Sequence, residues 1–192
     1  RGLPAEQRTQ ETLSFTVKGG AELVAVFAPV RDVSTAADLV AAVADASQGP
    51  NVIRVAEGLY DLSEQLSVTR DVRVVGAGAE RTVIRIPSSV AAAANHRVAY
   101  LNHANAVLER VTLTGGHTST DKTSGMGVKL DANGGLFCDA IVSNNYAVSS
   151  WHQRGGGVAI EGANGLVARC LITDNRIGIG GAEEYGGGVY MT

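Results

Sequence analysis

The stretch GGGVAIEGANGLVARCLITDN (155–175) repeats an earlier stretch of the same chain, GMGVKLDANGGLFCDAIVSNN (125–145). The two align from end to end with no gap, and a further Gly-Gly-Gly-Val follows at 186–189. Upstream, LERVTLTGG (108–116) aligns with FCDAIVSNN (137–145), a step one residue shorter. Periods of this length are typical of stacked repeats, in which one unit buries its apolar face against the next.

The repeated units are expected to be strands. They hold short apolar runs broken by Gly, Asn and Asp, and none shows the i, i+3, i+4, i+7 spacing of a helix. Stacked strands would lie about 4.8 Å apart and align their side chains in ladders. Asn145 over Asn175 would begin an asparagine ladder at a turn. The aligned apolar sets are Leu108, Phe137 and Val167; Val111, Ala140 and Cys170; Leu113, Val142 and Ile172; and Tyr100, Leu130, Ile160 and Met191.

One helix is expected ahead of the strands, in STAADLVAAVADASQGP (34–50). Thr35 can cap its start, with Asp38 three positions later, and Gly49-Pro50 would end it. Its apolar stripe would cover the open end of the stack. The stripe consists of Ala36, Leu39, Val40, Val43 and Ala46. Alternating strands with glycine turns are predicted next, in 51–62, 65–78 and 81–86.

Positions 1–30 form a separate unit in this interpretation. TLSFTVKGGAELVAVFA (12–28) alternates apolar and polar residues around Lys18-Gly19-Gly20, which predicts a hairpin. This hairpin is either the tail of a preceding module or part of the cap over the strands. Residues 31–192 would then form the repeat domain.

Composition excludes several classes of protein. The chain has 192 residues, a net charge of −3 and no cluster of Lys and Arg, so a nucleic-acid partner is not expected. No apolar run approaches the roughly 20 residues that span a bilayer. Cys138 and Cys170 lack metal-binding spacing and fall out of register with the repeat, so neither a disulfide nor a metal is expected from them. No cofactor motif is present.

Residues 33–192 resemble the right-handed parallel β-helix proteins of the pectate-lyase-like superfamily, particularly in NVIRVAEGLYDLSEQLSVTRDVRVVGAGAERTVI (51–84). The later units are similar to polymorphic outer membrane protein repeats, whose Gly-Gly-small-aliphatic motif stands here as GGGV (155–158). Their F-x-x-N motif stands as VSNN (142–145) and ITDN (172–175), with an aliphatic residue replacing Phe. The hairpin resembles the end of an internalin-B-type surface repeat. The resemblance implies an all-β solenoid with one capping helix, from a longer exported or cell-surface bacterial protein.

Functional residues are expected in four insertions that recur at the same phase of the repeat and so project from the same side: 87–97, 117–126, 146–154 and 176–186. Loops of this kind carry function while the strands carry stability. The charged and aromatic residues of this loop wall are His96, Arg97, His117, Asp121, Lys122, Trp151, His152, Arg154, Glu183, Glu184 and Tyr185.

Several of these residues have a chemical role to offer. Trp151 would stack on a sugar ring or else pack against the strands below. Arg154, Lys122 and Arg97 would neutralise a uronate carboxylate, and His152, Lys122 or Tyr185 would serve as the base of a lyase. His117 and Glu184 would add ligand contacts. Glu183 and Glu184 are adjacent and point apart in a strand, which argues against a glycosidase pair. Asp121, Asp131, Asp139 and Asp174 fall at different phases, so no metal site is expected.

Three functions remain open at this point. The first is a non-catalytic, adhesin- or passenger-like surface region that presents the loop wall to a carbohydrate or a host surface. The second is a polysaccharide lyase or glycoside hydrolase acting on an acidic polysaccharide, and the third is a carbohydrate-binding module. An enzyme should gather basic groups with an acid or base in one groove. Residues 186–192 would form the first strand of a unit with nothing stacked on it, which predicts end-to-end association.

Overall fold

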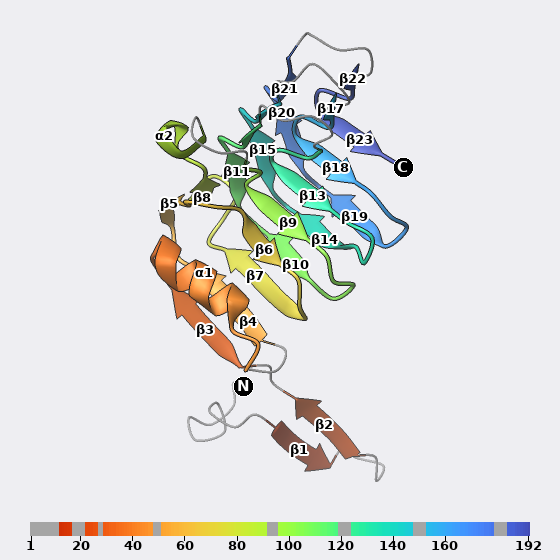
Figure 1. The fold of residues 1–192 in the computed structure, drawn as a ribbon. Coiled ribbons are helices and arrows are strands. Elements are labelled where there is room, and N and C mark those ends of the chain that lie inside the picture. The colour runs from red at the N-terminus through yellow and green to blue at the C-terminus, as the bar shows by residue number, and fades with distance from the viewer. Residues whose placement is uncertain are drawn as a thin grey trace.

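The computed structural model describes residues 12–16, 22–26, 29–47, 51–91, 96–118, 124–147, 153–178 and 184–192. Over these residues the protein is mostly β, and its main sheets are parallel (Figure 1). No helix in this part of the chain is long and apolar enough to cross a lipid bilayer.

Three parallel sheets, B, C and D, form the body of the protein, and the chain visits them in the repeating order B, C, D. We call one such pass a circuit. Sheet B contains β3 (Val30–Val33), β4 (Asn51–Val55), β7 (Val72–Gly76), β10 (Val107–Glu109), β14 (Gly135–Cys138) and β19 (Gly165–Ala168). Sheet C contains β5 (Gly58–Asp61), β8 (Thr82–Arg85), β11 (Thr112–Thr114), β15 (Ile141–Ser143) and β20 (Leu171–Thr173). Sheet D contains β6 (Leu66–Val68), β9 (Ala99–Leu101), β13 (Val128–Leu130), β18 (Val158–Ile160) and β23 (Val189–Met191).

The predicted apolar ladders are confirmed in sheets B and C. Phe137 pairs with Leu108 on one side and Val167 on the other. Val142 lies in the same way between Leu113 and Ile172. Phe137 and Val142 are fully buried, whereas Ile172, expected to be buried, is only partly so because β20 is the edge strand of its sheet.

The expected alignment of Tyr100 with Leu130 is wrong. Tyr100 pairs with Lys129, and the partner of Leu130 is Leu101. The step from Ala99 to its partner Val128 is one residue shorter than the next step, from Val128 to Val158. Because successive residues of a strand face opposite sides of the sheet, a slip of one residue moves Tyr100 from the core to the outer face.

One connection in the circuit changes its length while another stays constant. The path from sheet C to sheet D is as long from Ile84 to Ala99 as from Leu113 to Val128. It then lengthens by one residue in each of the next two circuits, from Val142 to Val158 and from Ile172 to Val189. The path from sheet B to sheet C keeps one length in the last three circuits, from Leu108 to Leu113, from Phe137 to Val142 and from Val167 to Ile172. The variable connections are the insertions of the loop wall.

The two glycines of the repeated Gly-x-Gly-Val motif are required for different physical reasons. The first, as in Gly125 and Gly155, has a φ of 60° or 61°, a left-handed conformation that favours glycine. The second, Gly127, has no room for a side chain. A Cβ there would lie 2.3 Å from the Val142 side chain and 2.9 Å from the Asn145 amide nitrogen.

Gly127→Ala is therefore expected to destabilise the protein, while Gly188→Ala provides a matched control. Gly188 occupies the same motif position at the end of the stack, and its Cβ would meet nothing closer than 3.7 Å. Overpacking at Gly127 should cost about 1–3 kcal/mol, and the control should be close to neutral. Thermal melting followed by circular dichroism measures both variants, and equal melting temperatures would contradict the assigned packing.

A buried asparagine ladder follows sheet C, as predicted. Asn145 is 1% exposed and donates through Nδ2 to Asn175 Oδ1 at 2.9 Å and to Leu113 O at 3.2 Å. Its Oδ1 accepts from the backbone N–H of Gly116 at 2.9 Å. Asn175 in turn donates to Val142 O at 2.8 Å. The ladder thus ties the turn of one circuit to its neighbours on both sides.

Helix α1 (Ala36–Ala44) packs on β3, β4 and β6 at one end of the sheets (Figure 1). Thr35 caps it as predicted, because its Oγ1 accepts from the N–H of Asp38 at 3.1 Å. The expected end at Gly49-Pro50 is wrong, since the helix stops at Ala44. Arg70 donates to two carbonyls of its last turn, those of Ala42 and Val43, at 2.8 and 2.9 Å. The helix buries Leu39, Ala42 and Val43, with Ala36 and Val40 partly buried, and Ala46 lies beyond it.

The other expected features are also present. Strands β1 (Thr12–Thr16) and β2 (Glu22–Val26) form the antiparallel hairpin, with Leu13 opposite Ala25. Lys18-Gly19-Gly20 lies outside the described residues. Both cysteines are free, and Cys170 donates to Ala168 O at 3.3 Å beside the core.

Candidate binding face

The loop-wall segments lie together between sheets C and D, as their phase predicted. Strands β12 (His117–Thr118), β16 (Tyr146–Ala147) and β21 (Arg176–Ile177) form the small parallel sheet E. Strands β17 (Gln153–Arg154) and β22 (Glu184–Tyr185) pair as sheet F, and α2 (Ser88–Ala91) belongs to the first insertion. In Figure 1 helix α2 and the labelled strands β17, β21 and β22 lie along the upper side of the molecule.

The structure describes some of the predicted site residues and not others. Lys122, Trp151 and His152 lie outside the described residues, as do Asp121 and Glu183. Glu184 and Tyr185 are described by their backbone alone, as the β22 partners of Gln153 and Arg154. Arg97, Arg154 and His117 are described in full, and their surroundings define two different faces.

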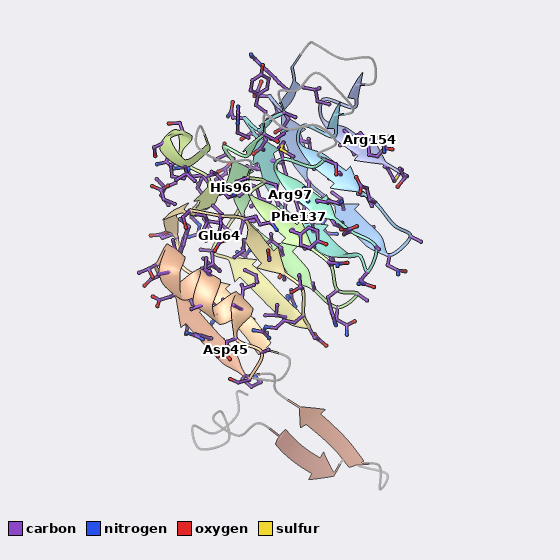
Figure 2. All side chains as sticks on the ribbon, viewed as in Figure 1. Asp45, Glu64, His96, Arg97, Phe137 and Arg154 are labelled. Carbon is purple, nitrogen blue, oxygen red and sulfur yellow. The ribbon has the colours of Figure 1, made fainter. Side chains whose placement is uncertain are left out.

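Arg97 and Arg154 each lie against an outward-facing tyrosine of sheet D. The Arg97 guanidinium carbon is 5.7 Å from the centre of the Tyr100 ring, and that of Arg154 is 5.1 Å from the centre of the Tyr190 ring. Both distances suit cation–π contacts. Tyr100 and Tyr190 belong to one outer row of sheet D, which reads Tyr100, Lys129, Ala159 and Tyr190. Figure 2 labels Arg97 and Arg154 over this sheet.

A charged network joins two residues of this row to acidic side chains that lie two positions further along the chain. Lys129 Nζ is 2.7 Å from Glu161 Oε2 and 3.6 Å from Asp131 Oδ2. The Tyr100 hydroxyl donates to Asp131 Oδ2 at 2.7 Å. The Lys129 side chain is 15% exposed. Ser124, which bridges to Arg154, also hydrogen-bonds Glu161. We call Arg97, Tyr100, Lys129, Asp131, Arg154, Glu161 and Tyr190 the sheet D face.

Three groups of the network have pKa values that are shifted further from neutral pH. Burial, with the hydrogen bond to Asp131, raises the pKa of Tyr100 to about 12. Burial opposes ionisation of Asp131, but the bonds from Tyr100 and the Ala132 N–H and the charge of Lys129 outweigh it and lower its pKa. Burial likewise opposes ionisation of Glu161, and bonds to Lys129 and Ser124 lower its pKa overall. At pH 7 the network therefore holds two carboxylates and a neutral tyrosine.

The two arginines carry positive charge in partly buried positions. Burial lowers the pKa of Arg97, and attraction to Glu161, Tyr100 and Asp131 acts in the opposite sense. Arg154 Nε is buried and has no hydrogen-bond partner among the described residues. A desolvated guanidinium whose N–H groups are not all satisfied gains from an anionic ligand more than an exposed one would.

His117 belongs to another face, because its strand is part of sheet E. It pairs with Tyr146, which pairs with Arg176, so these three residues form one row. The His117 and Tyr146 rings lie 5.9 Å apart at 59°. His96 bridges to His117 through the backbone in both directions.

One group of metal-ligating atoms comes together within the described part of the chain: Glu109, Cys138 and Asp139. Both carboxylates are ion-paired, Glu109 with Arg73 at 2.5 Å and Asp139 with Arg169 at 2.6 Å. Burial, together with Asp139 and Glu109, raises the pKa of the Cys138 thiol to about 12. A thiol must lose its proton to bind a metal, so this group is better suited to holding sheet B strands together.

Sequence reasoning missed most of the sheet D face. The sequence pattern does not single out Lys129, Glu161 or Tyr190. It excludes Asp131 as a metal ligand and predicts a core position for Tyr100. The shorter step between LERVTLTGG and FCDAIVSNN was the signal for the register of Tyr100.

A scan against protein-family models finds no match, and a search of curated proteins finds no similar sequence.

Proposed function

We propose that residues 31–192 form a right-handed parallel β-helix of an exported or cell-surface bacterial protein, and that it is a non-catalytic, adhesin-like region binding an anionic saccharide on the sheet D face. The repeated B, C, D order of parallel strands supports the β-helix. The observation that carries the ligand is the pair of partly buried arginines, Arg97 and Arg154, each of which lies against one of the two tyrosines of the outer sheet D row. Guanidinium groups bind carboxylates in two-pronged geometry, and tyrosine rings pack against sugar rings.

The protonation states favour binding over catalysis. A general base or acid works best with a pKa near the operating pH. The pKa values of Asp131 and Glu161 are lowered and that of Tyr100 is raised to about 12. Lys129 is engaged by both carboxylates. These groups are therefore suited to orienting a ligand rather than to exchanging a proton with it.

The double variant Arg97→Gln/Arg154→Gln is expected to lose binding to polygalacturonate at least about tenfold, because each charged hydrogen bond contributes roughly 1.5–3 kcal/mol. Electrophoresis in gels containing polygalacturonate measures the affinity. Arg54→Gln/Arg85→Gln is the matched control, since it removes two arginines from sheets B and C and leaves the sheet D face intact. Equal retardation of both double variants, or none of the wild type, would refute the proposed site. Release of unsaturated or reducing sugar ends by the wild type would replace the non-catalytic assignment with the lyase or hydrolase.

We also propose that this chain associates end to end. Val189 and Met191 pair with Val158 and Ile160 as predicted, but they are 46% and 71% exposed because β23 is the edge strand of sheet D. Edge strands β19 and β20 lie at the same end of their sheets. Unpaired strand edges with apolar side chains are templates for pairing.

Light scattering of the chain should show a mass that rises with concentration, and Val189→Lys/Met191→Lys should suppress the rise. Leu59→Lys is the control, since Leu59 is 54% exposed on the strand at the opposite edge of sheet C. A mass that stays monomeric at every concentration would show that the edge is not used.

A further inference from the structure

A cleft beside the sheet E row shares no lining residue with the sheet D face. It has a volume of about 410 Å³ and is lined by Asn144, Asn145, Tyr146, Asp174 and Arg176. This volume lies within the range of small-ligand sites, roughly 300–1,000 Å³. The cleft sits where the chain passes from β15 to β16 and, one circuit later, from β20 to β21.

Tyr146 provides an aromatic surface in this cleft. It lies in register between His117 and Arg176, and it is 38% exposed. The neighbouring His117 ring, tilted by 59°, supports it on one side. An exposed tyrosine beside a polar cleft offers an apolar ring and a hydrogen-bonding hydroxyl to the same ligand.

Polar groups of both charges surround the ring. Asp174 accepts at Oδ2 from Thr173 Oγ1 at 3.0 Å, which leaves Oδ1 for a ligand. Arg176 makes no ion pair with any residue that the structure describes, Asp174 included. Asn144 adds an exposed amide. A carboxylate accepts and a guanidinium donates, so together they match a pair of adjacent hydroxyl groups.

The backbone beneath these groups is rigidly held. Asn144 and Asp174 have φ values of 53°, and each directly precedes a ladder asparagine. The Asn145 backbone N–H and side-chain amide both donate to Asn175 Oδ1, at 3.1 and 2.9 Å, which joins the two circuits under the cleft. A site whose frame is fixed in advance loses less entropy on binding.

We propose that this cleft binds one pyranose ring of a neutral saccharide. The C–H face of the ring packs on Tyr146, and two adjacent hydroxyls lie between Asp174 and Arg176. The saccharide is expected to be neutral because Asp174 and Arg176 carry opposite charges that balance each other. Asp174 would also repel the carboxylate of an acidic sugar. The chemistry differs from that of the sheet D face, where two arginines favour an anion.

Gel electrophoresis in galactomannan, xyloglucan or dextran tests the proposal. At least one of these neutral polysaccharides should retard the wild type, and Tyr146→Ala and Asp174→Asn should each weaken retardation about tenfold. Tyr146→Phe keeps the ring and should stay within about threefold of the wild type. Asp174→Asn keeps the shape and tolerates the left-handed backbone, so its folding is not in question.

The control separates the two sites. Arg97→Gln/Arg154→Gln should bind the neutral polysaccharide normally, whatever its behaviour toward polygalacturonate. Retardation by none of the three polysaccharides would overturn the cleft proposal, as would retardation unchanged in Tyr146→Ala and Asp174→Asn. Either result leaves the polygalacturonate experiment to decide the sheet D face by itself.

Discussion

Val142→Asp is expected to lower the melting temperature by roughly 8–16 °C or to abolish the folding transition. Val142 is fully buried between Leu113 and Ile172. A carboxylate there would lie between the apolar side chains of Leu113 and Ile172, and a buried unpaired charge costs at least about 4 kcal/mol. For a domain of this size, each kcal/mol corresponds to roughly 2–4 °C. Thermal melting by circular dichroism measures the shift.

Two further variants bracket the result. Ser143→Asp places the same charge on the outward side of the same strand and should melt close to the wild type, because Ser143 is not buried. Ile172→Asp should fall between the two, since Ile172 lies on the edge strand and is half-buried. If Val142→Asp melted like Ser143→Asp, Val142 would not face the core.

Asn145→Ala should lower the melting temperature by roughly 6–12 °C, from a loss of about 3 kcal/mol. The change leaves the Gly116 N–H without its partner and removes the bond that Asn145 donates to the Leu113 carbonyl. It also removes the bond that joins the asparagine to Asn175. A buried group without a partner retains its full desolvation cost, which exceeds the net gain from the bond itself.

Asn164→Ala is the matched control, because Asn164 is an exposed turn residue of the same circuit repeat. Asn175→Ala should cost less than Asn145→Ala, since Asn175 is only partly buried. Similar melting of Asn145→Ala and Asn164→Ala would show that the ladder does not stabilise the turn.

The strand ladders could be predicted because apolar residues at fixed spacing leave few registers that bury them all. Leu113, Val142 and Ile172 illustrate this, since the aligned stretches that contain them fix the step of each circuit. Tyr100 was misplaced because its alignment with Leu130 used the longer step of the following circuit, whereas Tyr100 pairs with Lys129. The helix end was also missed. The carbonyls of its last turn are satisfied by Arg70, which is distant in sequence.

The sequence indicates where the sheet D face lies, but not most of the residues that form it. The recurring insertions lie between sheets C and D, and two of them supply Arg97 and Arg154 of the sheet D face. Lys129, Asp131 and Glu161 look like ordinary surface charges in the sequence. Their convergence depends on different circuits being in register, which is a property of the stacked strands rather than of any one segment.

The constant spacing between sheets B and C gives the molecule a simple way to grow. Duplicating the segment 125–154 would add one strand to each main sheet and lengthen the stack by about 4.8 Å. Everything downstream would keep its inward and outward faces. Duplicated Lys129 would then extend the outer row of sheet D by one more cation. Tandem duplication could thus lengthen the outer face of sheet D one circuit at a time. Each added circuit could differ in its sheet C-to-D connection, which already differs in length among the last three circuits.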